Sequence, residues 1–117
     1  MPNRIIEVRH QVRALSPAQA EIWFTVIAEH FTPTTELRGS VVGPRCAGRT
    51  TIEVAYPLQP IPHRQPTTPP LTMRAIIPDP GLWESDAPFT YHAAVELWQD
   101  GQRCGTQELE LGLRMRR

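Results

Sequence analysis

The chain has 117 residues, enough for one domain with an ordinary core, and its hydrophobic content of 40% and charged content of 21% are those of a soluble globular protein. Twelve Lys and Arg balance twelve Asp and Glu, so no global field attracts nucleic acid or an anionic membrane. The N-terminal residues lack the uninterrupted apolar stretch of a signal peptide or membrane span, which predicts a cytoplasmic protein.

Seven segments alternate apolar and polar residues with a period of two, and most are separated by proline or glycine. These segments are 4–13, 20–30, 35–42, 49–56, 71–77, 89–98 and 107–115. Short alternating segments with regular turn signals are typical of strands that bury one face. The sequence therefore predicts an all-β fold, a seven-stranded antiparallel immunoglobulin-like β-sandwich, with residues 1–117 forming a single domain.

The first segment predicts an inward face made of Ile6, Val8, His10 and Val12. On this face His10 is expected to be a satisfied core or edge histidine, in preference to a metal ligand. The second segment is ambiguous, because Ser16 could cap an amphipathic helix over 20–30. The run of β-branched and aromatic residues favours a strand there, and an α+β fold with one helix is the alternative.

The thirteen prolines fall mainly between the apolar segments, as expected when central strands need every backbone donor. Six of them lie in 57–70, which predicts an extended polyproline II connector outside the sheets. A ligand for a proline-recognising partner is the alternative for this stretch. Asp100-Gly101, between two alternating segments, predicts a tight hairpin.

The residues that carry chemistry are scattered along the chain. The four histidines have no metal-ligand spacing, no serine lies in a nucleophile-elbow motif, and no glycine-rich phosphate loop is present. Cys46 and Cys104 have no CxxC spacing, so we expect two reduced thiols, with a single disulfide as the alternative. The sequence therefore predicts no catalytic residue, no metal site and no cofactor.

A motif spans residues 82–114. It consists of Leu82-Trp83, Pro88, Tyr91, an alternating strand to Trp98, the hairpin at Asp100-Gly101, and Leu111-Gly112-Leu113-Arg114. In order and spacing it resembles the immunoglobulin-like sandwich domain of family 2 glycoside hydrolases, the β-galactosidase and β-glucuronidase type. The resemblance implies a stand-alone domain of this kind without the catalytic barrel, which would need about 250 further residues.

The resemblance also implies that these motif residues are architectural. Leu82 and Trp83 would cross between the sheets and place the indole in the end of the core. Pro88 would fix the corner, and Tyr91 would turn its ring inward and bond its hydroxyl to backbone as a tyrosine corner does. If the ring is buried, Trp83→Ala should cost about 3–5 kcal/mol of stability.

Three hypotheses of function follow. The first is a non-catalytic interaction or scaffolding module that binds a protein partner or itself, because Trp23, Ile27 and Trp98 are expected to face away from the core. The second is a carbohydrate-binding module, with Trp23 and Trp98 as candidate binding residues. The third is an accessory subunit of a split glycoside hydrolase. The basic residues 114–117 are too few to predict nucleic-acid binding.

Overall fold

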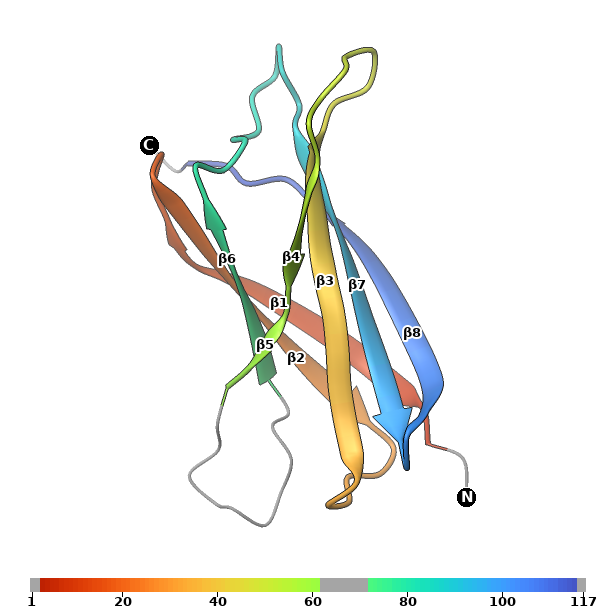
Figure 1. Ribbon diagram of the computed structural model, residues 1–117. Coiled ribbons are helices and arrows are strands. Elements are labelled where there is room, and N and C mark those ends of the chain that lie inside the picture. The colour runs from red at the N-terminus through yellow and green to blue at the C-terminus, as the bar shows by residue number, and fades with distance from the viewer. Residues whose placement is uncertain (1–2, 62–71, 116–117) are drawn as a thin grey trace.

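The computed structural model of the chain describes residues 3–61 and 72–115, which form two four-stranded antiparallel sheets (Figure 1). The strands are β1 (Ile5–Leu15), β2 (Gln19–Ala28), β3 (Thr35–Arg45), β4 (Val54–Pro57), β5 (Gln59–Pro60), β6 (Thr72–Pro78), β7 (Thr90–Gln99) and β8 (Gln102–Leu111). The predicted all-β sandwich is confirmed, although the described residues form eight strands and not seven.

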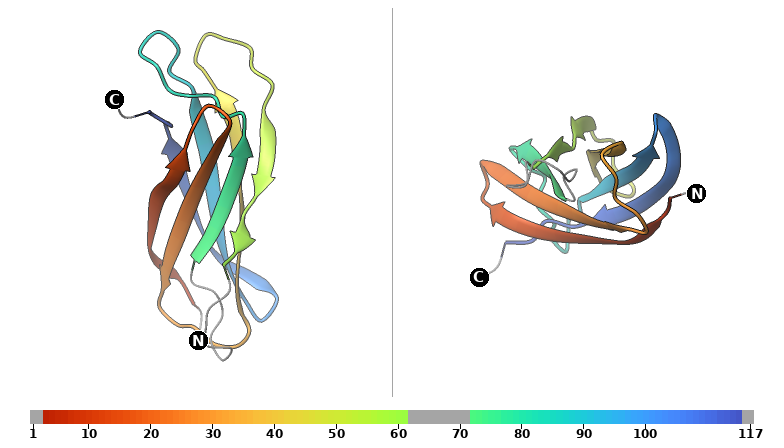
Figure 2. Two further views of the ribbon diagram at one scale, coloured as in Figure 1. Left: turned by 90° about the vertical axis from the view of Figure 1, so that its left-hand side faces the viewer. Right: turned by 90° about the horizontal axis from the view of Figure 1, so that it is seen from below.

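The two sheets have the orders β1-β2-β6-β5 and β4-β3-β7-β8, and they face each other as two layers (Figure 2). The core fills the space between them. Alternate residues of β2, β6 and β7 supply most of it, because successive side chains of a strand point to opposite faces. The fully buried ones on these strands are Ala20, Ile22, Phe24, Val26, Met73, Ala75, Ile77, Tyr91, Ala93, Val95 and Leu97.

The segment that could have been a helix is strand β2. It pairs with β1 on one side and with β6 on the other. Its buried residues recur every second position, whereas a helix would have buried a stripe of period 3.6. The strand prediction for this segment is therefore confirmed.

Two register shifts interrupt strand β1, between Ile5 and Glu7 and between Val12 and Ala14. A bulge adds one residue to a strand and changes which face the preceding residues take. The predicted inward position of Ile6 is therefore wrong. Ile6 is 53% exposed, and Ile5 packs against the core in its place.

The prediction for the proline-rich segment 57–70 is wrong at its beginning. Gln59 and Pro60 pair with β6 as the short strand β5. Buried Leu58, between β4 and β5, belongs to the core and holds this stretch of chain against the sandwich. The remainder of the predicted connector, 62–71, lies outside the described residues.

Prolines also deviate from their expected positions elsewhere. Pro44 lies within β3, at a register shift relative to β7. The strand predicted over 49–56 begins only at Val54, and Ile52 is 88% exposed.

The predicted hairpin at Asp100-Gly101 is confirmed. Both residues have positive φ values, 51° and 77°, as a two-residue hairpin turn of this type requires.

Strands β1 and β8 are edge strands, and both lie on the same side of the sandwich. They approach each other where Gly105 of β8 faces the side chain of Ile5. Towards the other end, β1 crosses diagonally and the two edges separate (Figure 1). This divergence leaves one side of the sandwich open, and the candidate site lies there.

Candidate functional site at the open edge of the sandwich

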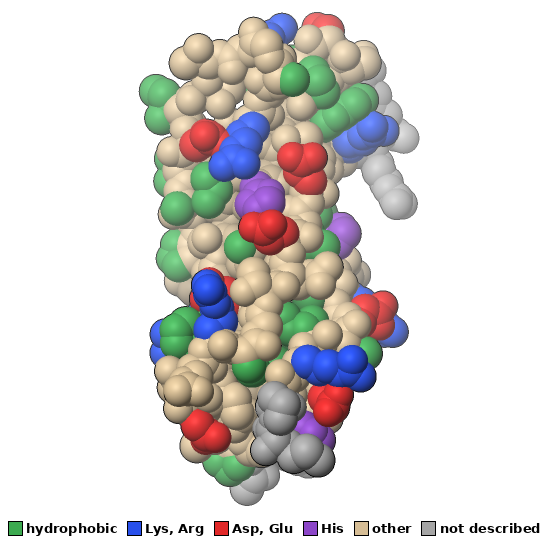
Figure 3. Space-filling model, turned by 90° about the vertical axis from the view of Figure 1, so that its right-hand side faces the viewer, with side chains coloured by type: hydrophobic (Ala, Val, Ile, Leu, Met, Phe, Trp, Pro, Cys, Tyr) green, Lys and Arg blue, Asp and Glu red, His purple; other side chains and the backbone are tan. Residues whose placement is uncertain are grey.

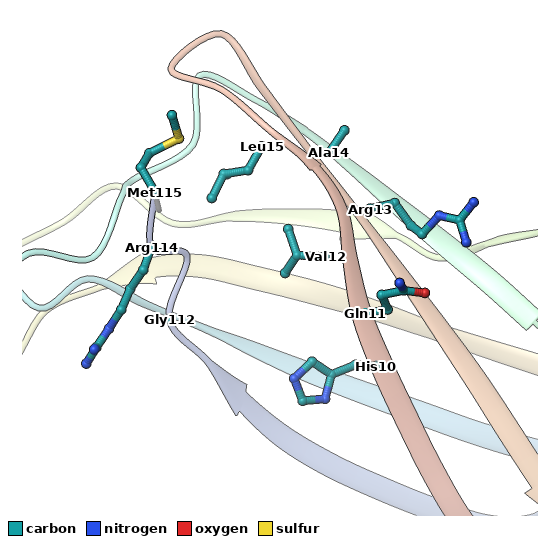
Figure 4. Close-up of a pocket in the computed structure, with 9 residues that line it drawn as sticks. All are labelled: His10, Gln11, Val12, Arg13, Ala14, Leu15, Gly112, Arg114 and Met115. Carbon is teal, nitrogen blue, oxygen red and sulfur yellow. The ribbon is translucent and has the colours of Figure 1, made fainter. Parts of the chain in front are cut away.

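A groove of about 940 Å³ lies between the second half of β1 and the residues that follow β8 (Figure 4). The side chains of His10, Val12 and Leu15 point from β1 towards Gly112 and Met115 on the opposite wall (Figure 4). Side chains Gln11, Arg13 and Ala14 point to the other side of β1. We call this feature the edge groove and define it by His10, Val12, Leu15, Gly112 and Met115.

The edge groove forms because, towards the end of β1, the side chains that face the core are no longer covered by other parts of the chain. Val8 is half-buried and packs against the core. His10 and Val12 have the same orientation, because they pair with buried Phe24 and Ile22 of β2, yet both are exposed. Val12 is 40% exposed and Met115 on the opposite wall is 46% exposed. Val12 thus faces the interior of the sandwich and is nevertheless open to solvent.

The chemistry of the edge groove suits binding. The groove contains one imidazole, that of His10, and no carboxylate belongs to the described residues around it. Arg13 and Arg114 border the groove, but their guanidinium groups lie over the rings of Trp23 and Trp83. A pair of acid and base side chains, as hydrolysis of a glycosidic bond uses, is therefore not assembled in this lining. Apolar side chains beside a strand edge instead suit an extended polypeptide.

The corner formed by residues 82–88 closes one end of the sandwich. The backbone N–H of Trp83 donates to the carbonyl of Leu113 at 2.8 Å, and Trp83 forms an isolated bridge with Pro88. Leu82 packs against the core. The indole of Trp83 is only half-buried: it lies against Gly112, and the Arg114 guanidinium stacks on it at 3.6 Å from the ring centroid. The sequence placed this indole in the end of the core; in the structure the ring lies at the rim of the core, and Leu113 is the fully buried residue next to it.

Because the Trp83 ring is only half-buried, its removal should lower the free energy of unfolding by less than the removal of a fully buried ring would. Trp83→Ala should reduce the free energy of unfolding by about 1–2 kcal/mol, from partial apolar burial and the lost cation–π contact. Urea denaturation followed by circular dichroism measures this difference. A loss of 3 kcal/mol or more would contradict the half-buried position and would show that the ring is packed in the core.

Tyr91 forms a tyrosine corner. Its side chain is 1% exposed, and its hydroxyl accepts a hydrogen bond of 2.7 Å from the backbone N–H of Gly81. Burial raises the pKa of the Tyr91 hydroxyl above its ordinary value of 10.0, and the hydrogen bond from Gly81 acts in the opposite direction. The inward ring and the backbone hydrogen bond expected of Tyr91 are both present, and they connect β7 to the chain that leads into the corner.

Trp23 and Trp98 lie on the outer faces of the two sheets and are half-buried. Their surroundings are the same. Each indole N–H donates to the glutamate two residues earlier, Glu21 at 2.9 Å and Glu96 at 3.0 Å. An arginine lies over each ring, Arg13 over Trp23 at 4.2 Å and Arg38 over Trp98 at 4.1 Å from the centroid.

A second arginine completes each of these arrangements. Arg74 reaches Glu21 at 3.7 Å, and Arg103 reaches Glu96 at 3.5 Å. Each sheet thus carries a tryptophan, a glutamate and two arginines in contact on its outer face. The arginines cover apolar ring surface with their stems and charged planes, which makes these tryptophans less open than the sequence suggests.

A smaller depression of about 360 Å³ lies beside Trp23 and is also lined by Arg9, Gln11 and Thr25. It brings one of the two tryptophans expected to bind a ligand next to hydrogen-bonding side chains. No comparable depression was expected from the sequence at this position, because Arg9 and Gln11 belong to a different strand and reach Trp23 only through the β1–β2 pairing.

The face of the molecule nearest β8 carries charged side chains of both signs, interspersed with small hydrophobic areas (Figure 3). Some of these charges are paired: the guanidinium of Arg103 lies 3.5 Å from the carboxylate of Glu96. The imidazole Nε2 of His92 lies 3.3 Å from the carboxylate of Glu108. Such a mixed surface gives no single-sign field that would select an ionic ligand.

Residues 3–61 and 72–115 contain no group of three His, Cys, Asp or Glu side chains placed to hold a metal ion. Within the same residues, Cys46 is buried and Cys104 half-buried, and both are free thiols. No helix in the described part of the chain is long and apolar enough to cross a membrane.

No family model and no curated protein matches the sequence. Solved structures do match the fold. The β-glucuronidase of Bifidobacterium dentium aligns over 96% of this chain with a TM-score of 0.62 and 18% identity. A glycosyl hydrolase family 2 member from Bacteroides cellulosilyticus aligns over 96% with a TM-score of 0.66 and 17% identity. The β-glucuronidase of Lactobacillus rhamnosus aligns over 97%, with a TM-score of 0.61 and 16% identity.

These matches cover only a small part of each enzyme. The present chain spans 17%, 15% and 16% of the three matched chains. At such low identity the likeness concerns the fold and not the activity. The chain therefore has the fold of a β-sandwich that occurs within family 2 glycoside hydrolases, in agreement with the resemblance of residues 82–114.

Proposed function

We propose that this chain is a non-catalytic β-sandwich module that binds another folded protein through the edge groove. The observation that carries the proposal is the exposure of two apolar side chains that flank an open strand edge: core-facing Val12 at 40%, and Met115 on the opposite wall at 46%. Exposed apolar side chains beside an unpaired strand edge suit a partner that adds a strand to the sheet.

The position of β1 supports an extended segment as the bound element. An edge strand has backbone N–H and C=O groups on one side that are not used within its own sheet, and these can pair with a strand from a partner. Within the described residues β1 pairs only with β2. Val12 and Leu15 would then contact alternate side chains of the added strand.

A partner that carries a glycoside hydrolase barrel is the first one to test. The fold likeness to segments of family 2 enzymes and the motif at 82–114 both support this class of partner. In this role the module would contribute binding surface and stability, and the partner would contribute the catalytic carboxylates.

Carbohydrate binding is the second candidate, and the depression beside Trp23 favours it. Stacking of a sugar needs a ring face that is free, however, and an arginine lies over each of the three indole rings, at 4.2, 4.1 and 3.6 Å. We therefore rank this candidate below protein binding. A change in tryptophan fluorescence on titration with a glycan, absent from the Trp23→Ala variant, would reverse the ranking.

Affinity capture with a matched pair of variants tests the principal proposal. Val12→Asp places a charge in the edge groove, and Ile52→Asp places the same charge at a residue that is 88% exposed and lies outside the groove lining. We expect wild type and Ile52→Asp to recover the same protein from extract of the source cells, and Val12→Asp to lose it, with thermal melts showing that all three chains are folded. Equal recovery by the two variants would refute the role of the groove.

A further inference from the structure

We propose that the depression beside Trp23 binds a small-molecule ligand through a carboxylate group, with the guanidinium of Arg13 as the partner of that carboxylate. The depression lies on the outer face of its sheet, and the side chains of Gln11 and Arg13 point away from the side of β1 that faces the edge groove (Figure 4). The inference therefore goes beyond the proposed function and does not depend on it.

The outer faces of the two sheets carry the same arrangement position for position, once on β2 and once on β7. On one side of each tryptophan, the directly opposite residue stands two positions before the arginine that lies over the ring. On the other side, the directly opposite residue is the second arginine. The equivalent residues of the β2 and β7 arrangements are Trp23 and Trp98, Glu21 and Glu96, Arg13 and Arg38, Arg74 and Arg103, and Gln11 and Glu36. Only the last of these pairs differs in charge.

This one difference leaves the β2 arrangement with one carboxylate fewer than the β7 arrangement. On β7 the arginine over the ring has a carboxylate beside it, because Glu36 accepts a hydrogen bond of 2.9 Å from the guanidinium of Arg38. At the equivalent position beside Arg13 stands the uncharged amide of Gln11. The β2 arrangement therefore has one positive charge in excess, whereas the charges of the β7 arrangement balance.

The excess charge belongs to Arg13, because the neighbouring arginines have partners. Arg9 lies 3.2 Å from the carboxylate of Glu7, and Arg74 lies 3.7 Å from that of Glu21. Arg13 takes part in none of the ion pairs formed within the described part of the chain. The residues outside that part contain no Asp or Glu that could supply a carboxylate.

The depression lies at the same place, where Gln11 and Trp23 face each other across the strand pair. Its volume of about 360 Å³ is within the range of small-ligand sites, roughly 300–1,000 Å³. Arg9, Gln11 and Thr25 supply a guanidinium, an amide and a hydroxyl, and no carboxylate belongs to the described residues around it. Guanidinium groups bind carboxylates through charge-assisted hydrogen bonds. A ligand carboxylate beside Gln11 would thus do for Arg13 what Glu36 does for Arg38.

Titration with sodium acetate, followed by the indole N–H resonances in ¹H–¹⁵N spectra, tests the inference. Each tryptophan gives one such resonance, and Trp→Phe variants assign them. Sodium chloride keeps the ionic strength, and with it the screening of surface charges, constant. We expect the Trp23 resonance to shift along a saturating curve and the Trp98 resonance to stay in place. Acetamide, which has the shape of acetate without its charge, should move neither resonance.

Exchange of the one differing position provides matched variants. Gln11→Glu supplies the carboxylate from the chain itself, so it should raise the acetate concentration at half saturation of the Trp23 shift about fivefold. Glu36→Gln removes the equivalent carboxylate and should make the Trp98 resonance respond to acetate. Arg13→Gln should abolish the response of Trp23, with the backbone amide spectrum showing that the fold is retained.

The outcomes decide the inference without reference to the edge groove. A saturating shift confined to Trp23, lost in Arg13→Gln and transferred to Trp98 by Glu36→Gln, supports it. It is overturned if acetate moves neither resonance or moves both equally in the wild type, or if the exchanged variants respond as the wild type does. The capture experiment with Val12→Asp tests the proposed function separately, because Val12 faces the opposite side of β1.

Discussion

Replacing Tyr91 by alanine is expected to lower the free energy of unfolding by about 3–5 kcal/mol. The ring belongs to the core cluster at 1% exposure, and its removal leaves a cavity that the flanking strands cannot fill. The same change deprives the backbone N–H of Gly81 of its acceptor. Urea denaturation followed by circular dichroism measures the difference.

The matched variant Tyr91→Phe separates these two contributions. It keeps the ring and removes only the hydroxyl, so we expect a loss of about 1–2 kcal/mol. If Tyr91→Ala and Tyr91→Phe were equally stable, the ring would not be part of the core, and the fold described for this end of the sandwich would be incorrect.

Replacing Gly39 by alanine should destabilise the protein by about 3 kcal/mol or more, because the nearest atom is a backbone carbonyl oxygen of a central strand, which cannot move aside cheaply. An added Cβ at Gly39 would lie 2.1 Å from the carbonyl oxygen of Ala94 on the adjacent strand β7 and 2.9 Å from the side chain of Leu58. Relieving that contact requires β3 and β7 to separate, and both are central strands.

Gly105→Ala is the control for this substitution. Gly105 also lies in a strand, and an added Cβ there would meet the Ile5 side chain at 3.4 Å, an ordinary contact distance. Its midpoint of thermal unfolding should stay near that of wild type, while that of Gly39→Ala falls by many degrees. Equal midpoints for the two variants would show that β3 and β7 are not as closely packed at Gly39 as described.

The parts of the fold that sequence reasoning predicted are those in which a strand is flanked on both sides. In β2 and β7 every second residue is buried between two sheets, so the alternation of apolar residues is strict and can be read directly. The hairpin at Asp100-Gly101 was predictable for a similar reason, because its conformation depends on those two residues alone.

Edges and corners could not be predicted in the same way. The bulge at Ile6 depends on pairing with β2, which is distant in sequence, and the alternating pattern of β1 contains no sign of it. The partial burial of Trp83 depends on its contacts with Gly112, Leu113 and Arg114, which lie about thirty residues further along the chain. The edge groove arises from the angle between β1 and β8, and a single strand does not encode that angle.

The surroundings of two tryptophans could not be predicted from the sequence either. The alternation of residues along each strand predicts that Trp23 and Trp98 point outward, but it does not predict that arginine side chains lie over their rings. Arg13 reaches Trp23 from the neighbouring strand β1, and Arg38 reaches Trp98 from β3. A Glu-x-Trp sequence on a strand is a signal that could have been used, since it places the carboxylate on the same face as the indole N–H.

Amide hydrogen exchange of β1, followed residue by residue, tests most directly whether this strand is the binding surface of the molecule. In dilute protein, alternate amides between Glu7 and Val12 should exchange rapidly while those of β2 and β7 stay protected. In the complex with a captured partner, the same β1 amides should become protected. If every β1 amide were protected in the dilute chain, or if complex formation left their exchange unchanged, the open edge would not be the site of binding.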